Sequence, residues 1–221
     1  MSLRAADIEA IVPAAGQGTR LGLGPKAFVT LSGRTLLEHV VTTLLAVAAR
    51  VTVAVPPTDL QAADRLVGGA RIRIVAGGMR RIDTVRLLIE AGTAPWLLLH
   101  DVAHPFATKE LAQRVLDEAP GTGAAAAALA NVDFLYGMDG TLRANPGTVV
   151  AIQKPIAFRR ADAVRGLAAA DRAAGGAPVH DMSVLEILEY ASQRVAFVPG
   201  HPLNFKLTTA EDFELARRLM A

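Results

Sequence analysis

Short apolar runs alternate with amphipathic stretches along most of this chain. The runs predict strands at residues 8–12, 51–55, 71–75, 96–100 and 194–198. Apolar positions at helical spacing predict helices at residues 34–48, 81–91, 108–118, 159–170, 181–190 and 210–220. The alanine-rich stretch from Gly123 to Ala130 fits either a strand or a helix. We therefore expect an α/β fold, with one Rossmann-like domain over residues 1–221 and a mainly parallel sheet flanked by helices.

The segment from Val132 to Gln153 breaks this alternation. Residues 134–138 and 141–143 flank Asp139-Gly140, a dipeptide typical of a two-residue hairpin turn. We expect a β-hairpin arm that leaves the domain and returns to it. Its apolar side chains would expose a large patch to water, and a symmetric dimer is the commonest way to cover such a patch.

Composition excludes several classes of protein. The chain is 52% hydrophobic, but no apolar run reaches the roughly eighteen residues that span a bilayer. It has no cysteine, which excludes a disulfide framework and a thiolate metal site. The formal net charge is +2 and the basic residues are scattered, which argues against a nucleic-acid partner. Since the start of the chain shows no secretory signal, we expect a cytoplasmic protein that does not bind membranes.

The loop after the first predicted strand carries the clearest chemical signal. Residues 13–21 are rich in alanine and glycine, so that backbone N–H groups are open to a ligand, and Arg20 and Lys26 add two cations. The pattern does not match the dinucleotide fingerprint, because Leu21 stands where the third glycine belongs. It does not match a P-loop either, because no Ser or Thr follows Lys26. The loop suits a polyphosphate, and a tight connection with solvated cations is the alternative interpretation.

A series of short motifs runs along nearly the whole chain. They are Ala14-Ala15-Gly16-x-Gly18-x-Arg20-Leu21, Pro25-Lys26, Gly33-Arg34-Thr35-Leu36-Leu37-Glu38-His39, Gly77-Gly78 before Arg81-x-Asp83-Thr84-Val85, His100-Asp101-Val102-Ala103, and Asn204-Phe205-Lys206-Leu207-Thr208 before Glu211-Asp212. In order and spacing they resemble the signature of sugar-nucleotide pyrophosphorylases and cytidylyltransferases, in particular the branch that acts on 2-C-methyl-D-erythritol 4-phosphate. The resemblance implies an enzyme of non-mevalonate isoprenoid biosynthesis. In its reaction an acceptor phosphate attacks the α-phosphorus of CTP and pyrophosphate is released.

The resemblance assigns roles on the nucleotide side. Arg20 and Lys26 would be catalytic, because they would hold the triphosphate and stabilise the charge of the transition state. Main chain and the hydroxyl of Thr84 would contact the pyrimidine and exclude a purine by shape. Arg81 and Asp83 resemble a residue pair beside that pocket, and a salt bridge at the start of the helix accounts for them equally well. The expected nucleotide-binding residues are Pro13, Ala14, Ala15, Gly16, Gly18, Gly78, Arg81, Asp83 and Thr84.

Magnesium is the expected cofactor, because the candidate ligands are all oxygens. Asp101 follows the apolar run at 96–99. Burial of an unpaired carboxylate there would cost free energy, whereas a carboxylate that binds magnesium would be stabilised. A helix N-cap or a hydrogen-bonded loop aspartate is the alternative. The resemblance also places Asp212 near the metal, although an ordinary first-turn carboxylate of the last helix explains it equally well. His100 is expected to be a hydrogen-bonded packing residue.

The acceptor side departs from the family pattern. A family arginine is replaced by His104, two hydroxyls are replaced by Phe134 and Val179, and Lys154 introduces a new cation. Lys206 matches the family lysine that neutralises the sugar phosphate. The expected substrate-binding residues are His104, Asp133, Lys154 and Lys206. Two alternatives stay open: a cytidylyltransferase for another polyol phosphate such as ribitol 5-phosphate, and a non-catalytic nucleotide-binding paralogue.

The resemblance also implies a homodimer formed through the arm. Asp133 and Arg143 of one subunit would then complete an acceptor site with His104, Lys154 and Lys206 of the other. An arm folded back on its own domain is the alternative.

Overall fold

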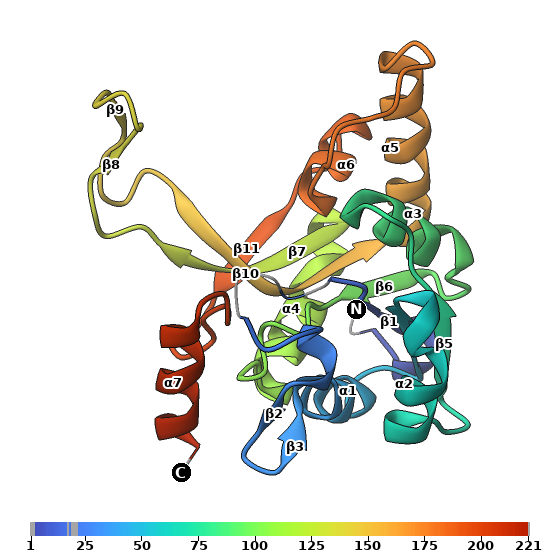
Figure 1. Cartoon of the computed structure of the whole chain (residues 1–221). Helices are drawn as coiled ribbons and strands as arrows, with labels where there is room; N and C mark the ends of the chain where they lie inside the picture. The colour runs from blue at the N-terminus through green and yellow to red at the C-terminus, as the bar shows by residue number, and fades with distance from the viewer. Residues whose placement is uncertain (1–2, 17, 19–21, 221) are drawn as a thin grey trace.

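A central sheet lies between two layers of helices (Figure 1). The computed structural model describes residues 3–16, 18 and 22–220, and in this part of the chain the sheet has seven strands in the order β11-β7-β10-β6-β1-β4-β5. The strands are β1 (Ile8–Pro13), β4 (Arg50–Val55), β5 (Ile72–Ala76), β6 (Trp96–Leu99), β7 (Ala124–Ala130), β10 (Val150–Arg159) and β11 (Ala196–Pro199). The pairings are parallel except for those of β10, which runs antiparallel to β6 and β7. The predicted α/β fold with a mainly parallel sheet is confirmed.

Helices cover both faces of the sheet. One core packs α1 (Leu36–Leu45), α2 (Leu60–Val67) and α4 (Lys109–Thr122) against it, and the other packs α3 (Arg81–Ala91), α5 (Arg160–Ala173) and α6 (Val184–Tyr190). The last helix, α7 (Ala210–Leu219), packs on a small core beside β2 (Thr30–Leu31) and β3 (Arg34–Thr35). Short 3-10 turns lie at Ala5–Asp7, Lys26–Phe28 and Pro57–Asp59. None of the helices in the described residues is long and apolar enough to cross a membrane.

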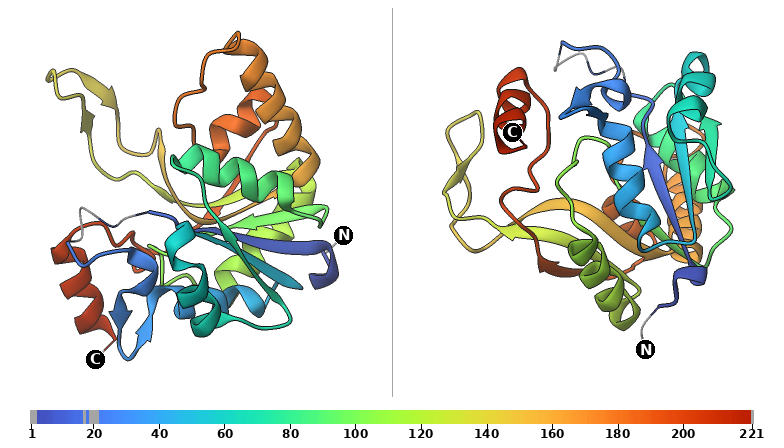
Figure 2. Two further views of the ribbon diagram at one scale, coloured as in Figure 1. Left: turned by 45° about the vertical axis from the view of Figure 1, so that its right-hand side comes forward. Right: turned by 90° about the horizontal axis from the view of Figure 1, so that it is seen from below.

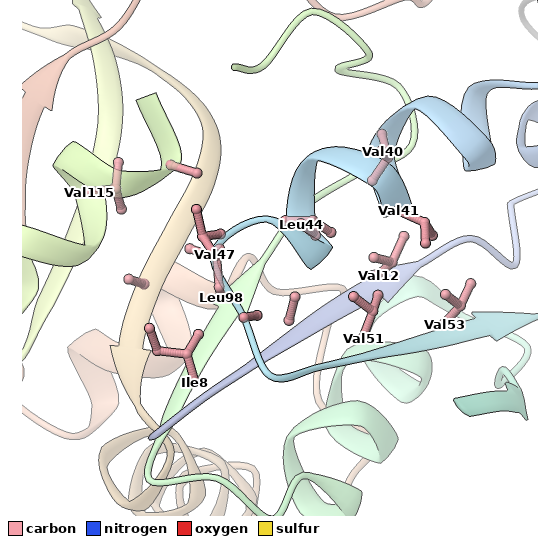
Figure 3. Packing of buried hydrophobic residues seen from close by; sticks show 14 of the residues in the cluster. Ile8, Val12, Val40, Val41, Leu44, Val47, Val51, Val53, Leu98 and Val115 are labelled. Atoms are coloured by element: carbon pink, nitrogen blue, oxygen red, sulfur yellow. The ribbon is translucent and has the colours of Figure 1, made fainter. Parts of the chain in front are cut away.

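Strand β1 shows why the strands of this chain are short, continuous apolar segments of the sequence. Ile8 and Val12 point toward α1 and α4, where they pack among buried valines and leucines (Figure 3), while Ile11 belongs to the core on the opposite face. A parallel strand that is covered on both faces needs apolar side chains at nearly every position. The exception, Glu9, is buried too, and its carboxylate accepts hydrogen bonds from Thr52 Oγ1 at 2.7 Å and from the Thr93 backbone N–H at 2.8 Å.

The predicted helices and strands are all present, with ends shifted by a few residues. The alanine-rich stretch forms strand β7, whose small side chains are buried in the middle of the sheet. Helix α2 and the long strand β10 were not predicted. The antiparallel direction of β10 follows from its connection to β7, because the chain returns directly through the arm instead of through a helix.

The arm is a hairpin that projects from the sheet (Figures 1 and 2). It contains β8 (Leu135–Tyr136) and β9 (Leu142–Ala144). The predicted two-residue turn is wrong. The Gly137 N–H donates to the Thr141 carbonyl at 2.8 Å, so residues 138–140 make the connection and Gly140 ends it at φ +78°. Within its own chain the arm leaves Phe134, Tyr136 and Met138 exposed.

A bulge in β10 brings two polar residues to the carboxyl edge of the sheet. Ile152 pairs with Ala128 and Ile156 with Ala126, so three residues of β10 lie opposite one residue of β7. The extra residues leave the ladder, and a bulge of this kind redirects side chains. Gln153 donates from Nε2 to the His201 and Asn204 carbonyls, at 2.9 and 3.0 Å, in the loop that follows β11.

Candidate active site

A cavity of about 320 Å³ lies at the carboxyl ends of β1, β5 and β6. This is where ligands bind in open α/β sheets. The residues that line it are Pro13, Ala14, Ala15, Gly16, Gly18, Lys26, Gly78, Met79, Arg80, Arg81, Thr84, Asp101, Val102, Ala103 and Lys206. All the predicted nucleotide-binding residues except Asp83 are therefore together, with Lys26, Asp101 and Lys206 beside them. Arg20, the other predicted catalytic residue, lies outside the described residues.

Two tight backbone approaches shape the cavity wall. Gly18 has φ +67°, and a Cβ there would collide with the Gly24 carbonyl, so the first loop folds back on itself only with glycine at this position. A Cβ on Gly77 would lie 2.6 Å from the Cβ of Ala15. The turn after β5 is thus pressed against the loop after β1, and the two main chains form one continuous surface.

The hydroxyl of Thr84 fixes that turn from α3. Thr84 is buried, and its Oγ1 accepts a hydrogen bond from the Gly78 N–H at 3.0 Å. The same hydroxyl donates toward the Gly78 and Arg80 carbonyls, whose oxygens both lie 3.3 Å from Oγ1. The predicted contact of this hydroxyl with a pyrimidine stays a prediction, and in this structure its partners are backbone groups of the same turn.

Asp101 is the one carboxylate that lines the cavity among the described residues. Its Oδ1 is buried and has no hydrogen-bond partner in that part of the chain. Burial by itself would raise the pKa of this carboxyl group, but the positive charges of Lys154, Arg81 and Lys206 outweigh the effect and hold the pKa below its ordinary value. Asp101 is therefore ionised, and an oxygen of it remains able to accept a further partner.

Two buried histidines support the turn that carries Asp101. The Nε2 of His100 lies 3.0 Å from the His104 carbonyl, and the Nδ1 of His104 lies 3.2 Å from the Asn204 carbonyl, so each of these nitrogens carries a proton and donates. Burial lowers the pKa of His100 to about 3 and that of His104 to about 4. His104 is thus neutral at pH 7, and it does not replace the positive charge of the family arginine.

The loop that carries Lys206 is tied to the same turn. The Asn204 carbonyl accepts from His104 and from Gln153, the Asn204 side chain donates from Nδ2 to the Lys154 carbonyl at 2.7 Å, and the Leu207 N–H donates to the Ala103 carbonyl at 2.8 Å. Sequence reasoning gave Gln153 and Asn204 no role. The position of Asn204 inside a family motif was the available signal, but its contacts join segments 50 to 100 residues apart in the sequence.

Three lysines lie around this turn in different settings. Lys26 donates from Nζ to the Leu207 carbonyl at 2.6 Å, which joins the first loop to the loop of Lys206. Lys154 is buried, and burial lowers its pKa although the charge of Asp101 opposes the shift. Lys154 is not among the residues that line the cavity, so it acts on Asp101 from behind the wall.

The expected pairing of Arg81 with Asp83 is wrong. Asp83 binds Arg80 instead, with Nη2 to Oδ1 at 2.6 Å and Nε to Oδ2 at 3.0 Å. Arg80 is the N-cap residue of α3 and Asp83 is the third residue of the helix, so the two side chains meet in its first turn. Arg81 points Nη1 at the Met182 carbonyl, 3.4 Å away. A salt bridge at the start of α3 does exist, but sequence reasoning overlooked the arginine that makes it.

Asp212 and Asp133 are further predicted site residues that do not line the cavity. The carboxylate of Asp212 accepts from the Thr208 and Thr209 N–H groups, both at 2.8 Å, and so caps α7. Asp133 lies on the exposed arm. The described residues contain no group of three or more His, Asp or Glu side chains that could hold a metal ion.

The fold and the cavity define an α/β protein with a cavity lined by lysine and arginine side chains at the carboxyl edge of its sheet, where open α/β sheets bind ligands. A family model described as 2-C-methyl-D-erythritol 4-phosphate cytidylyltransferase matches residues 8–221. The chain belongs to this family, as its motifs predicted. The family consists of cytidylyltransferases, which are nucleotidyltransferase enzymes, so the predicted enzyme class is also confirmed.

Relatives match over nearly the full chain. The 2-C-methyl-D-erythritol 4-phosphate cytidylyltransferase of Deinococcus radiodurans is 39% identical over 216 residues, which are 95% of this chain and 88% of the relative. The Thermus thermophilus protein of the same name is 38% identical over 221 residues, 96% of this chain and 97% of the relative. A crystal structure of the enzyme from Thermus thermophilus superposes with a TM-score of 0.80 at 31% identity, and covers 100% of this chain and 99% of its own.

Proposed function

We propose that the protein transfers CMP from CTP to 2-C-methyl-D-erythritol 4-phosphate, with release of pyrophosphate. The observation that carries the proposal is the match of the family to residues 8–221, which includes every residue of the cavity. The cavity itself supports nucleotidyl transfer, because it offers main-chain donors, Lys26 and Lys206 on one side and an ionised Asp101 on the other.

The chemistry needs positioning and charge stabilisation more than covalent participation. An oxygen of the acceptor phosphate forms a bond to the α-phosphorus, and the bond from that phosphorus to the bridging oxygen of pyrophosphate breaks. Lys26 and Arg20 would stabilise the negative charge that develops on the transferring group. Lys206 would neutralise the acceptor phosphate, so that two anions can approach each other.

Magnesium fits the cavity through Asp101. The buried Oδ1 without a partner among the described residues is a hard oxygen ligand, and magnesium is commonly held by one or two carboxylates together with substrate phosphates. When bound, the ion would supply further positive charge to the triphosphate. The geometry gives Asp212 a capping role through Oδ2, so its predicted metal contact stays a prediction.

A second acceptor substrate is also a candidate. The neutral, buried His104 and the buried Lys154 give this chain an acceptor side that differs from the family pattern. This observation favours another polyol phosphate, such as ribitol 5-phosphate, as the alternative acceptor.

The homodimer and the cytoplasmic location are further parts of the proposal. Exposed Phe134, Tyr136 and Met138 on a projecting hairpin support an arm that is covered by a second subunit. Asp133 lies on the same arm, so it could contribute to the partner's acceptor site but lies away from its own cavity.

The test is pyrophosphate release from CTP and magnesium across a panel of acceptors. We expect turnover with 2-C-methyl-D-erythritol 4-phosphate and none with ATP, GTP or UTP in place of CTP. Faster turnover with ribitol 5-phosphate would favour the second candidate. CTP binding without turnover on any polyol phosphate would contradict both and indicate a nucleotide-binding protein without activity.

A further inference from the structure

The guanidinium of Arg80 joins the start of α3 to a segment about a hundred residues away. Its Nη1 donates to the Val179 carbonyl at 2.8 Å, while Nε and Nη2 hold the Asp83 carboxylate. All three nitrogens therefore have protein partners. The charge of Arg80 is compensated by this bidentate carboxylate, whereas Lys26, another cation of the cavity wall, donates to the backbone carbonyl of Leu207.

Three contacts fasten residues 179–182 to the first turn of α3. Beside the Arg80 contact, the Ile82 N–H donates to Oδ1 of Asp181 at 2.9 Å, and Arg81 Nη1 reaches the Met182 carbonyl. The Asp181 contact satisfies one of the backbone donors that a helix N-terminus leaves open. These contacts hold the connection between α5 and α6 against the start of α3 at a point where the chain has no regular secondary structure.

Arg81 links this segment to the chemistry. It lines the cavity, and its charge lowers the pKa values of both Asp101 and Lys154. Lys154 and the segment that holds Val179 belong to the expected acceptor side, so we assign Arg81 to that side, although the resemblance implied a place beside the nucleotide. The segment at 179–182 provides the carbonyl toward which Arg81 is aimed. A change that releases the segment therefore also releases Arg81, whereas the hydrogen bond between Gly78 and Thr84 on the nucleotide side involves no residue of 179–182.

We infer that Arg80 is a positioning residue that clamps residues 179–182 onto α3 and so aims Arg81 at the acceptor side of the cavity. The inference deepens the proposed function and rests on it for the identity of the substrates. It gives Arg80 no direct contact with the nucleotide, although the residue lines the cavity.

The experiment compares Arg80→Gln with Arg86→Gln. Arg86 is a matched control, because it lies on α3 and holds an aspartate by two bonds, to Asp171 of α5 at 2.7 and 2.9 Å, away from the cavity. In Arg80→Gln we expect KM for the acceptor to rise roughly tenfold to a hundredfold, as for a misplacement of about 1 Å, with KM for CTP nearly unchanged. Arg86→Gln should lose comparable thermal stability, but KM for the acceptor should not rise relative to KM for CTP.

Hydrogen exchange gives a readout that does not depend on activity. The Ile82 amide, which donates to Asp181 in this clamp, should exchange faster in Arg80→Gln than in the unmodified chain, while the amides of α5 and α6 should not. If Arg80→Gln does not fold, Asp181→Ala serves the same comparison, because it removes a different contact of the same clamp.

Two results would overturn the inference. A raised KM for CTP that Arg80→Lys restores would show that Arg80 binds phosphate directly through its charge. If Arg80→Gln and Arg86→Gln changed both KM values equally, the contacts of Arg80 would contribute only to the general stability of the fold. Absence of turnover in the unmodified chain would instead count against the proposed function, and the exchange measurement would still decide the clamp.

Discussion

Lowering the pH from 7 to 5 is expected to destabilise the folded chain through His104. The residue is buried at 6% exposure, and burial lowers its pKa to about 4, although the nearby charge of Asp101 opposes the shift. In the unfolded chain an imidazole titrates near ~6.5. Between these two values the unfolded state binds more protons than the folded state, so the free energy of unfolding falls as the pH falls.

The two pKa values set the magnitude. At pH 5 the unfolded imidazole is almost fully protonated and the folded one is not, which corresponds to about 2 kcal/mol. Because pH 5 lies above the folded pKa, this figure depends mainly on the unfolded value. His100, whose pKa is lowered to about 3 by burial, adds an effect of similar sign and size. Together they are a large part of the roughly 5–15 kcal/mol that stabilise a typical domain.

The assay is urea unfolding at pH 7 and pH 5 for the unmodified chain and for His104→Asn. The asparagine amide can replace the Nδ1 donor toward the Asn204 carbonyl, but it does not titrate. We expect the unmodified chain to lose about 2 kcal/mol more than the variant between the two pH values. His180→Asn, at an exposed position, controls for the loss of a histidine. Equal losses in His104→Asn and the unmodified chain would refute a neutral, buried His104.

Three further predictions concern the reaction. Arg20→Ala and Lys26→Ala should each lower kcat by about 10²- to 10³-fold and change KM for CTP much less, because their contacts strengthen in the transition state. Steady-state kinetics with an unchanged kcat in these variants would show that the two residues are not catalytic. Asp101→Asn should lower turnover and raise the magnesium concentration needed for half-maximal activity, and full activity in excess chelator would contradict a metal at Asp101. A mixture of Lys26→Ala chains with Asp133→Ala chains should regain part of the activity, because the acceptor site is expected to span two subunits. A fully active species that sediments as a monomer would exclude such a shared site.

The sequence by itself determined the layers of the fold and the chemical character of the cavity. Both are local properties. Strand β1 is apolar at nearly every position because it is covered on both faces, and this reads directly from the chain. The glycine at position 18 and the lysine at position 26 signal a phosphate-binding loop because small residues and cations are required wherever main chain meets such a ligand. The edge of a parallel sheet then brought this loop and Asp101 together, as predicted.

Only the tertiary structure decided which charged groups have partners. Asp83 binds Arg80 instead of Arg81, Asp212 caps a helix away from the cavity, and the bulge in β10 puts Lys154 behind the wall. His104 is neutral because of its burial, which no local pattern shows. For Asp83 and Asp212, whose partners are three or four residues away, the fold selects one of several neighbouring partners. For Lys154 and His104 the contacts are distant in the sequence. Hydrogen bonds and electrostatic interactions depend on distances of a few ångströms that the folded chain sets, whereas hydrophobic patterning depends on the spacing of residues along it.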